Sequence, residues 1–150
     1  KDAVSPPLAA AQLMQPVDQE MIAADFASVS LLHDATIVEG TGGIICPYTL
    51  YADGRRVMQA DVVKALGLAS VIVADSGPDT LNATLLTAGY MRAHDLPIAG
   101  VILNHFDARD LVCQDNLATI ELLGDTDVVA TIADGGAMTL RKPFFLLEQD

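Results

Sequence analysis

Residues 71–86 read VIVADSGPDTLNATLL, and this stretch decides the predicted fold. Its first four residues, Val71-Ile72-Val73-Ala74, form a continuous apolar run, which is typical of a strand buried on both faces. A short polar loop follows. From Thr80 to His94, apolar residues recur at helical spacing, namely Leu81, Leu85, Ala88 and Met91. A buried strand that leads through a short loop into a helix predicts one βα unit of a parallel sheet.

The same pattern recurs on both sides of this unit. Three further β-branched runs predict strands at residues 36–38, 101–103 and 128–132. Helical patterns cover residues 18–33 and 110–123, and Ser5-Pro6 predicts a further helix start. Because strands alternate with helices, we expect right-handed crossovers in a single α/β domain over residues 1–150, with a parallel sheet covered by helices on both faces.

The composition fits such a core and excludes several classes of protein. Of 150 residues, 51% are hydrophobic and 5% aromatic, so small aliphatic side chains fill the core. The formal net charge of −12 argues against a nucleic-acid partner, which requires a basic surface. The apolar runs are too short to cross a membrane. Cys46 and Cys113 show neither metal nor disulfide spacing, which favours a cytoplasmic location.

Ligands of open α/β sheets bind beyond the carboxyl ends of the strands, so the residues after each strand are the candidates. Residues 39–43, Glu-Gly-Thr-Gly-Gly, follow the first predicted strand. With phosphates nearby, the Glu39 carboxylate suits Mg²⁺, and the glycine-rich turn suits an anion. A tight turn with an exposed Glu39 explains the same residues equally well.

The loops after the next two predicted strands hold the other candidates. Backbone N–H groups near residues 80–82 can bind a carboxylate or phosphate, although capping by Asp79 or Thr80 would use the same donors. Asn104 offers a donor and an acceptor that match an adenine edge, although a loop cap is the commoner role. A Gly-x-x-x-x-Gly-Lys-Ser/Thr phosphate loop does not occur in the sequence.

The predicted strands, helices and loop motifs, taken in their order along the chain, resemble dethiobiotin synthetase, an ATP-dependent enzyme of biotin synthesis. The resemblance runs from Ser5 to about Ile132. Its matching segments are Ser5-Pro6 with the Ala-rich helix start, residues 38–43 (VEGTGG), 80–87 (TLNATLLT) and 96–104 (LPIAGVILN). The Glu-Gly-x-Gly-Gly motif is shared with cobyrinate amidating synthases, whereas the helix start at Thr80 points more specifically to the biotin enzyme.

The resemblance implies a P-loop NTPase-like, Rossmann-like three-layer fold whose N-terminal third, with the phosphate loop, is missing. The fragment alone would therefore be inactive, and its catalytic residues are unknown. The intact enzyme would use ATP and Mg²⁺ to carboxylate 7,8-diaminononanoate with CO₂ and close the ring of dethiobiotin. A cytoplasmic homodimer is also implied.

The resemblance also assigns residues to roles. Glu39 would bind Mg²⁺. The assigned nucleotide-binding residues are Glu39, Gly40, Gly43 and Asn104. The assigned substrate-binding residues are Val4, Ser5, Pro6, Thr41, Gly42, Thr80, Leu81 and Asn82.

Two segments depart from the family pattern. Residues 132–134 read Ile-Ala-Asp where the family usually has Ile-Pro, and residues 77–79 lack the usual Leu-Gly pair. Two alternatives therefore stay open. One is a non-catalytic regulatory or binding domain of the same fold. The other is a relative of cobyrinic acid diamide synthase, which would need a glutamine amidotransferase domain.

Overall fold

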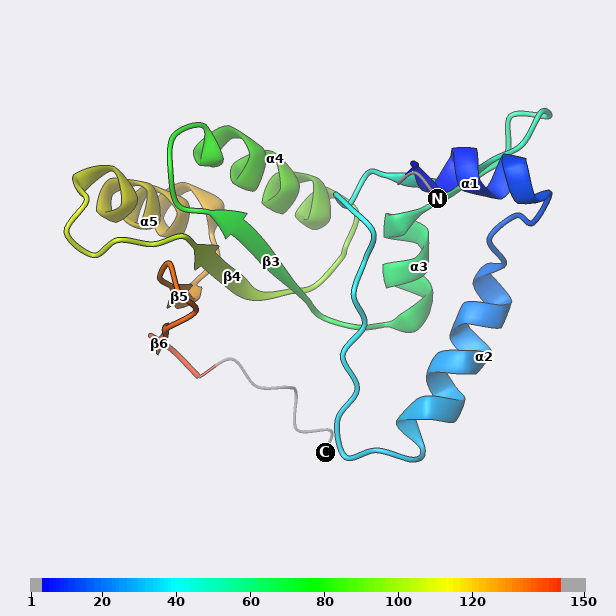
Figure 1. Ribbon diagram of the computed structural model, residues 1–150, viewed down its shortest axis with the longest axis horizontal. Helices are drawn as coiled ribbons and strands as arrows, with labels where there is room; N and C mark the ends of the chain where they lie inside the picture. Colours follow the sequence, from blue (N-terminus) through cyan, green and yellow to red (C-terminus); the bar gives the residue numbers. More distant parts are fainter. Residues whose placement is uncertain (1–3, 144–150) are drawn as a thin grey trace. The chain divides into compact units, whose positions relative to one another are not determined.

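The computed structural model describes residues 4–143, and Figure 1 shows their helices and strands. The chain divides after Leu68 into two compact units, here called unit 1 and unit 2. Of the helices within the described residues, none combines the length and apolar character needed to span a lipid bilayer.

Unit 2 forms a four-stranded sheet with two helices. In chain order its elements are β3 (Ser70–Asp75), α4 (Thr80–Ala93), β4 (Ile98–Asn104), α5 (Leu111–Gly124), β5 (Val128–Ile132) and β6 (Met138–Leu140). The strands are ordered β3-β4-β5-β6; the first three run parallel, and β6 is antiparallel to β5. The strands predicted at residues 71–74, 101–103 and 128–132 and the helices between them are confirmed, whereas β6 was not predicted.

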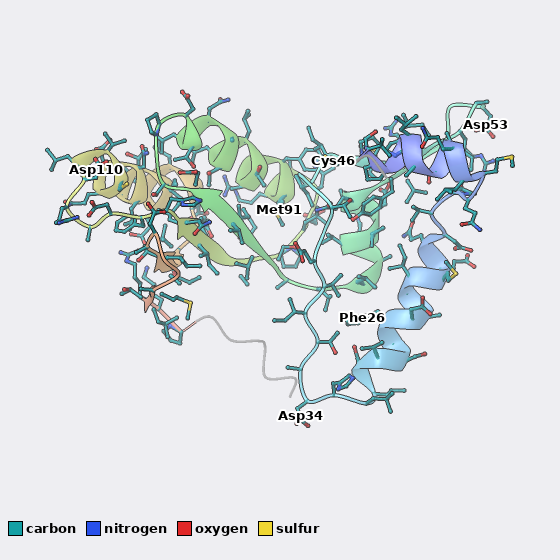
Figure 2. All side chains as sticks on the ribbon, in the orientation of Figure 1. Phe26, Asp34, Cys46, Asp53, Met91 and Asp110 are labelled. Atoms are coloured by element: carbon teal, nitrogen blue, oxygen red, sulfur yellow. The ribbon has the colours of Figure 1, made fainter. Side chains whose placement is uncertain are left out.

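Both helices of unit 2 lie on the same face of the sheet and pack against each other (Figure 1). The strand order advances from β3 to β5 without reversing, so two crossovers of the same hand place both helices on one side. Within the described residues of unit 2, no helix lies on the second face of this sheet. The helices cover a core of fully buried Val101, Leu103, Ile120 and Val128. Met91 of α4, labelled in Figure 2, is also buried.

The close packing of β4 on β5 requires a glycine at position 100. A Cβ atom added there would lie 2.4 Å from Cγ1 of Val129, and the φ angle of Gly100 is +153°. A side chain at this position would therefore overlap Val129 and strain the backbone.

The segment around β6 is fastened to unit 2 by ion pairs. Arg141 donates its backbone N–H to the Val129 carbonyl at 2.8 Å and its Nη1 to Oε1 of Glu121 at 2.9 Å. Burial raises the pKa of Glu121. Hydrogen bonds from Arg141 and the Val128 N–H, together with the charges of Arg141 and Lys142, outweigh that effect, so this pKa lies below its ordinary value. Glu121 is therefore an ionised anchor for the segment after β6.

Unit 1 contains three helices and a hairpin. Its elements are α1 (Pro6–Leu13), α2 (Gln19–Ser30), β1 (Pro47–Leu50), β2 (Arg56–Met58) and α3 (Gln59–Leu66). The predicted helix starts are confirmed. Ser5 is the N-cap residue of α1, although its side chain makes no capping hydrogen bond. Asp18 caps α2 by accepting from the N–H groups of Glu20 and Met21.

The strand predicted at residues 36–38 is wrong. These residues have no regular structure, and Ile37 is 93% exposed. A three-residue run becomes a strand only when a neighbouring strand accepts its backbone hydrogen bonds, and the only strands described in unit 1 pair with each other as β1 and β2. That hairpin was not predicted, although Asp53-Gly54 at its turn is a known hairpin signal.

Candidate functional site

The carboxyl ends of β3 and β4 lie side by side in unit 2. Asp75, the last residue of β3, is the register partner of Asn104, the last residue of β4. The two loops that follow therefore leave the sheet from neighbouring points. This edge is where parallel α/β sheets bind ligands, and it carries the predicted residues 80–82 and 104.

The start of α4 is not capped by a side chain. Asp79 occupies the N-cap position at a φ of +68° but makes no capping hydrogen bond. The Thr80 hydroxyl instead donates to the Asp75 carbonyl at 2.6 Å. The alternative that Asp79 or Thr80 caps the helix is therefore wrong for this structure. An uncapped helix start presents unpaired N–H groups and the positive end of the helix dipole, which together favour an anion.

The three residues predicted at this helix start differ in exposure. The Thr80 side chain is buried, and Leu81 packs against the core of unit 2. Asn82 is exposed. Thr80 can therefore contact a ligand only through its backbone N–H group, whereas Asn82 can also offer its side chain.

Ser76 and Asn116 belong to this edge but were not predicted. Asn116 of α5 donates through Nδ2 to the carbonyls of Ser76 at 3.0 Å and Gly77 at 2.9 Å. The Ser76 hydroxyl donates to the His105 carbonyl at 2.8 Å. The one sequence feature that could have indicated this role is the polar Asn116 on the buried face of its helix, between Cys113 and Ile120.

His105 and Asp134 form an exposed pair beside the same edge. Nδ1 of His105 lies 2.7 Å from Oδ1 of Asp134, and the two side chains are 60% and 86% exposed. The hydrogen bond to Asp134 raises the pKa of His105, and the charges of Asp134 and Asp75 raise it further. The backbone N–H of Phe106 donates to the Ile132 carbonyl at 2.9 Å. The loops after β4 and β5 are thus joined, and Asp134 stands in one of the segments that depart from the family pattern.

The glycine-rich loop, residues 39–43, lies in unit 1 and is exposed. Gln59 at the start of α3 holds it by donating Nε2 to the Gly42 carbonyl at 3.2 Å. A Cβ atom at Gly40 would lie 2.4 Å from that same Nε2 atom, and Gly42 has a φ of +142°. A side chain at position 40 would therefore displace the Gln59 amide from the loop, and one at position 42 would strain the backbone. The role of Gln59 was not predicted from the sequence.

Glu39 is the only predicted metal ligand. Within residues 4–143, no group of three or more His, Cys, Asp or Glu side chains could hold a metal ion. The single exposed carboxylate of Glu39 cannot form a metal site by itself. It does fit Mg²⁺ that is bound mainly by phosphates and water, because such ions take one or two carboxylates from the protein.

The predicted residues thus fall into two sets, one in each unit. Residues 80–82 and Asn104 lie at the carboxyl edge of the sheet in unit 2. The set in unit 1 consists of the start of α1, where Val4 and Ser5 are exposed and Pro6 is half-buried, and the glycine-rich loop.

A hollow of about 590 Å³ lies at the opposite, amino edge of the same sheet. Its wall includes the carboxylates of Glu121, Asp125 and Asp127. Because ligands of parallel sheets bind at the carboxyl edge, the hollow is not the candidate site.

Comparison with known proteins shows the family of the chain. The model of the AAA_26 family, described as an AAA domain, matches residues 1–135. The chain belongs to this family. The predicted P-loop NTPase-like α/β fold is thereby confirmed.

Several curated relatives are named ATP-dependent dethiobiotin synthetase. The protein of Brachyspira hyodysenteriae is 38% identical over 135 residues, which cover 90% of this chain and 61% of the relative. The proteins of Clostridium botulinum (strain Eklund 17B) and Clostridium perfringens are 38% and 34% identical, covering 81% and 85% of this chain but 52% and 55% of the relatives. The resemblance to this group is confirmed, and the chain spans roughly half to three fifths of the length of these relatives.

Proposed function

We propose that this chain is part of an ATP-dependent dethiobiotin synthetase. The observation that carries the proposal is the uncapped start of α4, which follows β3 at the carboxyl edge, where Asp75 is the register partner of Asn104. The uncapped helix start supports binding of an anionic substrate, and the amide of Asn104 supports binding of a nucleotide. Similarity to proteins named ATP-dependent dethiobiotin synthetase supports the further proposal that this substrate is 7,8-diaminononanoate.

In the proposed reaction, one amine of the substrate combines with CO₂ to form a carbamate, which ATP then phosphorylates. The second amine attacks the activated carbon, closes the ring and releases phosphate. Catalysis of this kind depends mainly on positioning and electrostatic stabilisation. The N–H groups of residues 80–82 would hold the carboxylate of the substrate, and the Asn104 amide would orient the adenine.

Unit 1 would supply the remaining contacts. Residues 4–6 would border the aliphatic chain of the substrate, and residues 40–43 would line the carbamate and phosphate region. Glu39 would hold Mg²⁺, which neutralises phosphate charge when it is bound. The proposed assembly is a cytoplasmic homodimer, in which residues 80–82 of one subunit bind the substrate held by the other. Residues 1–150 would belong to one domain.

The test is incorporation of labelled bicarbonate into dethiobiotin by the intact protein that the gene encodes. Incorporation should require ATP, Mg²⁺ and the diamino acid. Asn104→Leu should raise the KM for ATP by about tenfold, because one site-specific pair of hydrogen bonds is lost. Its KM for the diamino acid should change little. Folded protein that incorporates no label contradicts the proposed function.

A further inference from the structure

Ser76 joins the two loops that leave the carboxyl ends of β3 and β4. Its backbone N–H donates to the Asn104 carbonyl at 3.0 Å, and its hydroxyl donates to the His105 carbonyl at 2.8 Å. The side chain is completely buried. Ser76 therefore cannot contact a ligand through its side chain, and both hydrogen bonds fix the separation of the two loops.

Asn116 holds Ser76 from the side of α5. Its Nδ2 donates to the Ser76 and Gly77 carbonyls, and the residue is 6% exposed. The Sγ atom of Cys113 lies 3.4 Å from the Ser76 hydroxyl oxygen. Burying polar groups is costly unless they are hydrogen-bonded. A buried network in which every polar group is hydrogen-bonded therefore holds its side chains in a single arrangement. These contacts therefore hold residues 76 and 77 in one position.

The same loop continues into the start of α4. The Thr80 hydroxyl donates to the Asp75 carbonyl at 2.6 Å, and the Gly77 N–H donates to Oδ1 of Asp75 at 2.9 Å. Residues 75–80 are thus fastened internally, while Ser76 ties them to the loop after β4. A shift at Ser76 would move the helix start relative to Asn104.

We infer that Ser76 and Asn116 are positioning residues, which set the distance between the N–H groups of residues 80–82 and the loop after β4. This inference rests on the proposed function. Several N–H groups bind one carboxylate together only while they keep their positions, so displacing the start of α4 weakens binding of the substrate.

The test compares Ser76→Ala and Asn116→Leu with Ile120→Val in the intact protein. Ile120 lies one turn beyond Asn116 on α5 and is fully buried, but its side chain forms no part of this network, so its variant controls for a general loss of stability. Ser76→Ala should raise the KM for the diamino acid by about tenfold while kcat falls by less than about threefold, the pattern of lost ground-state binding. Asn116→Leu should do the same, and Ile120→Val should leave both constants near those of the original protein.

Amide NMR signals give a readout that is independent of turnover. Ser76→Ala should shift the signals of Leu81 and Phe106 together, because the two loops share this contact. A shift confined to residues 75–77 would overturn the inference, and so would a KM within about twofold of the original value. If the original protein makes no dethiobiotin, the proposed function fails. The joint shift of Leu81 and Phe106 then still decides whether Ser76 couples the two loops.

Discussion

Replacing Gly100 by Ala should destabilise unit 2 by about 2–6 kcal/mol. The new Cβ atom would lie 2.4 Å and 3.0 Å from the two γ-carbons of Val129, and 3.3 Å from the backbone oxygen of Asp127. Overpacking of a tight core costs about 1–3 kcal/mol, and an unfavourable positive φ adds a similar amount. Because Val129 is 98% buried on the neighbouring strand, its side chain has little room to move away.

The assay is equilibrium unfolding in urea, with Gly89→Ala as the matched control. Gly89 lies inside α4, and a Cβ atom there would meet nothing within 4 Å. The same chemical change should therefore stabilise the protein by up to about 1 kcal/mol at position 89. Adding Val129→Ala to Gly100→Ala should recover part of the loss, because the two contacted methyl groups are removed. Equal effects at both glycines would refute the steric reasoning.

Three further variants test other parts of the structure. Glu121→Gln should lower the free energy of unfolding by about 1–3 kcal/mol, through loss of the pairing with Arg141. The pKa of Glu121 is lowered in the folded state, so this stabilisation is present above pH 4.5 and is lost as the pH falls through the pKa of the folded protein. If Glu121→Gln destabilised the protein equally at every pH, the ion pair with Arg141 would be contradicted. Asp134→Asn should return the pKa of His105 toward 6.5, as followed by NMR of the imidazole ring; an unchanged titration would show that the pair does not form. Glu39→Gln should reduce turnover more than stability, and unchanged turnover would remove its proposed metal role.

The pairing of His105 with Asp134 also has a defined effect on stability. The pKa of His105 is raised in the folded state, so its stabilising contribution is complete below the unfolded value of 6.5. It is lost as the pH rises through the folded pKa. The trend is therefore opposite to that of Glu121.

Sequence reasoning located the elements of unit 2 because each buried parallel strand is a continuous apolar run between amphipathic helices. The same reasoning failed at residues 36–38, because a local run does not reveal whether a partner strand is present. It also missed the β1–β2 hairpin. There the strands are only four and three residues long, and the Asp53-Gly54 turn was the sole strong signal.

The candidate site was only partly predictable. The place of residues 80–82 and Asn104 at the carboxyl edge could be predicted because they follow strands, and strand ends mark the ligand edge of a parallel sheet. The hydrogen bond from Asn116 to Ser76 joins residues 40 positions apart in the chain, and that from Ser76 to His105 joins residues 29 apart. Contacts at such separations depend on how the helices and strands pack, so local patterns do not reveal them.

The proposed function rests on binding of the substrate carboxylate by the N–H groups at the start of α4, and a titration followed by NMR tests this binding directly. The intact protein, labelled with ¹⁵N, would be titrated with 7,8-diaminononanoate and with the amide of the same compound. We expect the acid to shift the backbone signals of residues 80–82 and the amide to shift them much less, because a neutral group gains less from the helix dipole. Equal shifts with both compounds, or no shift at these residues, would contradict the claim.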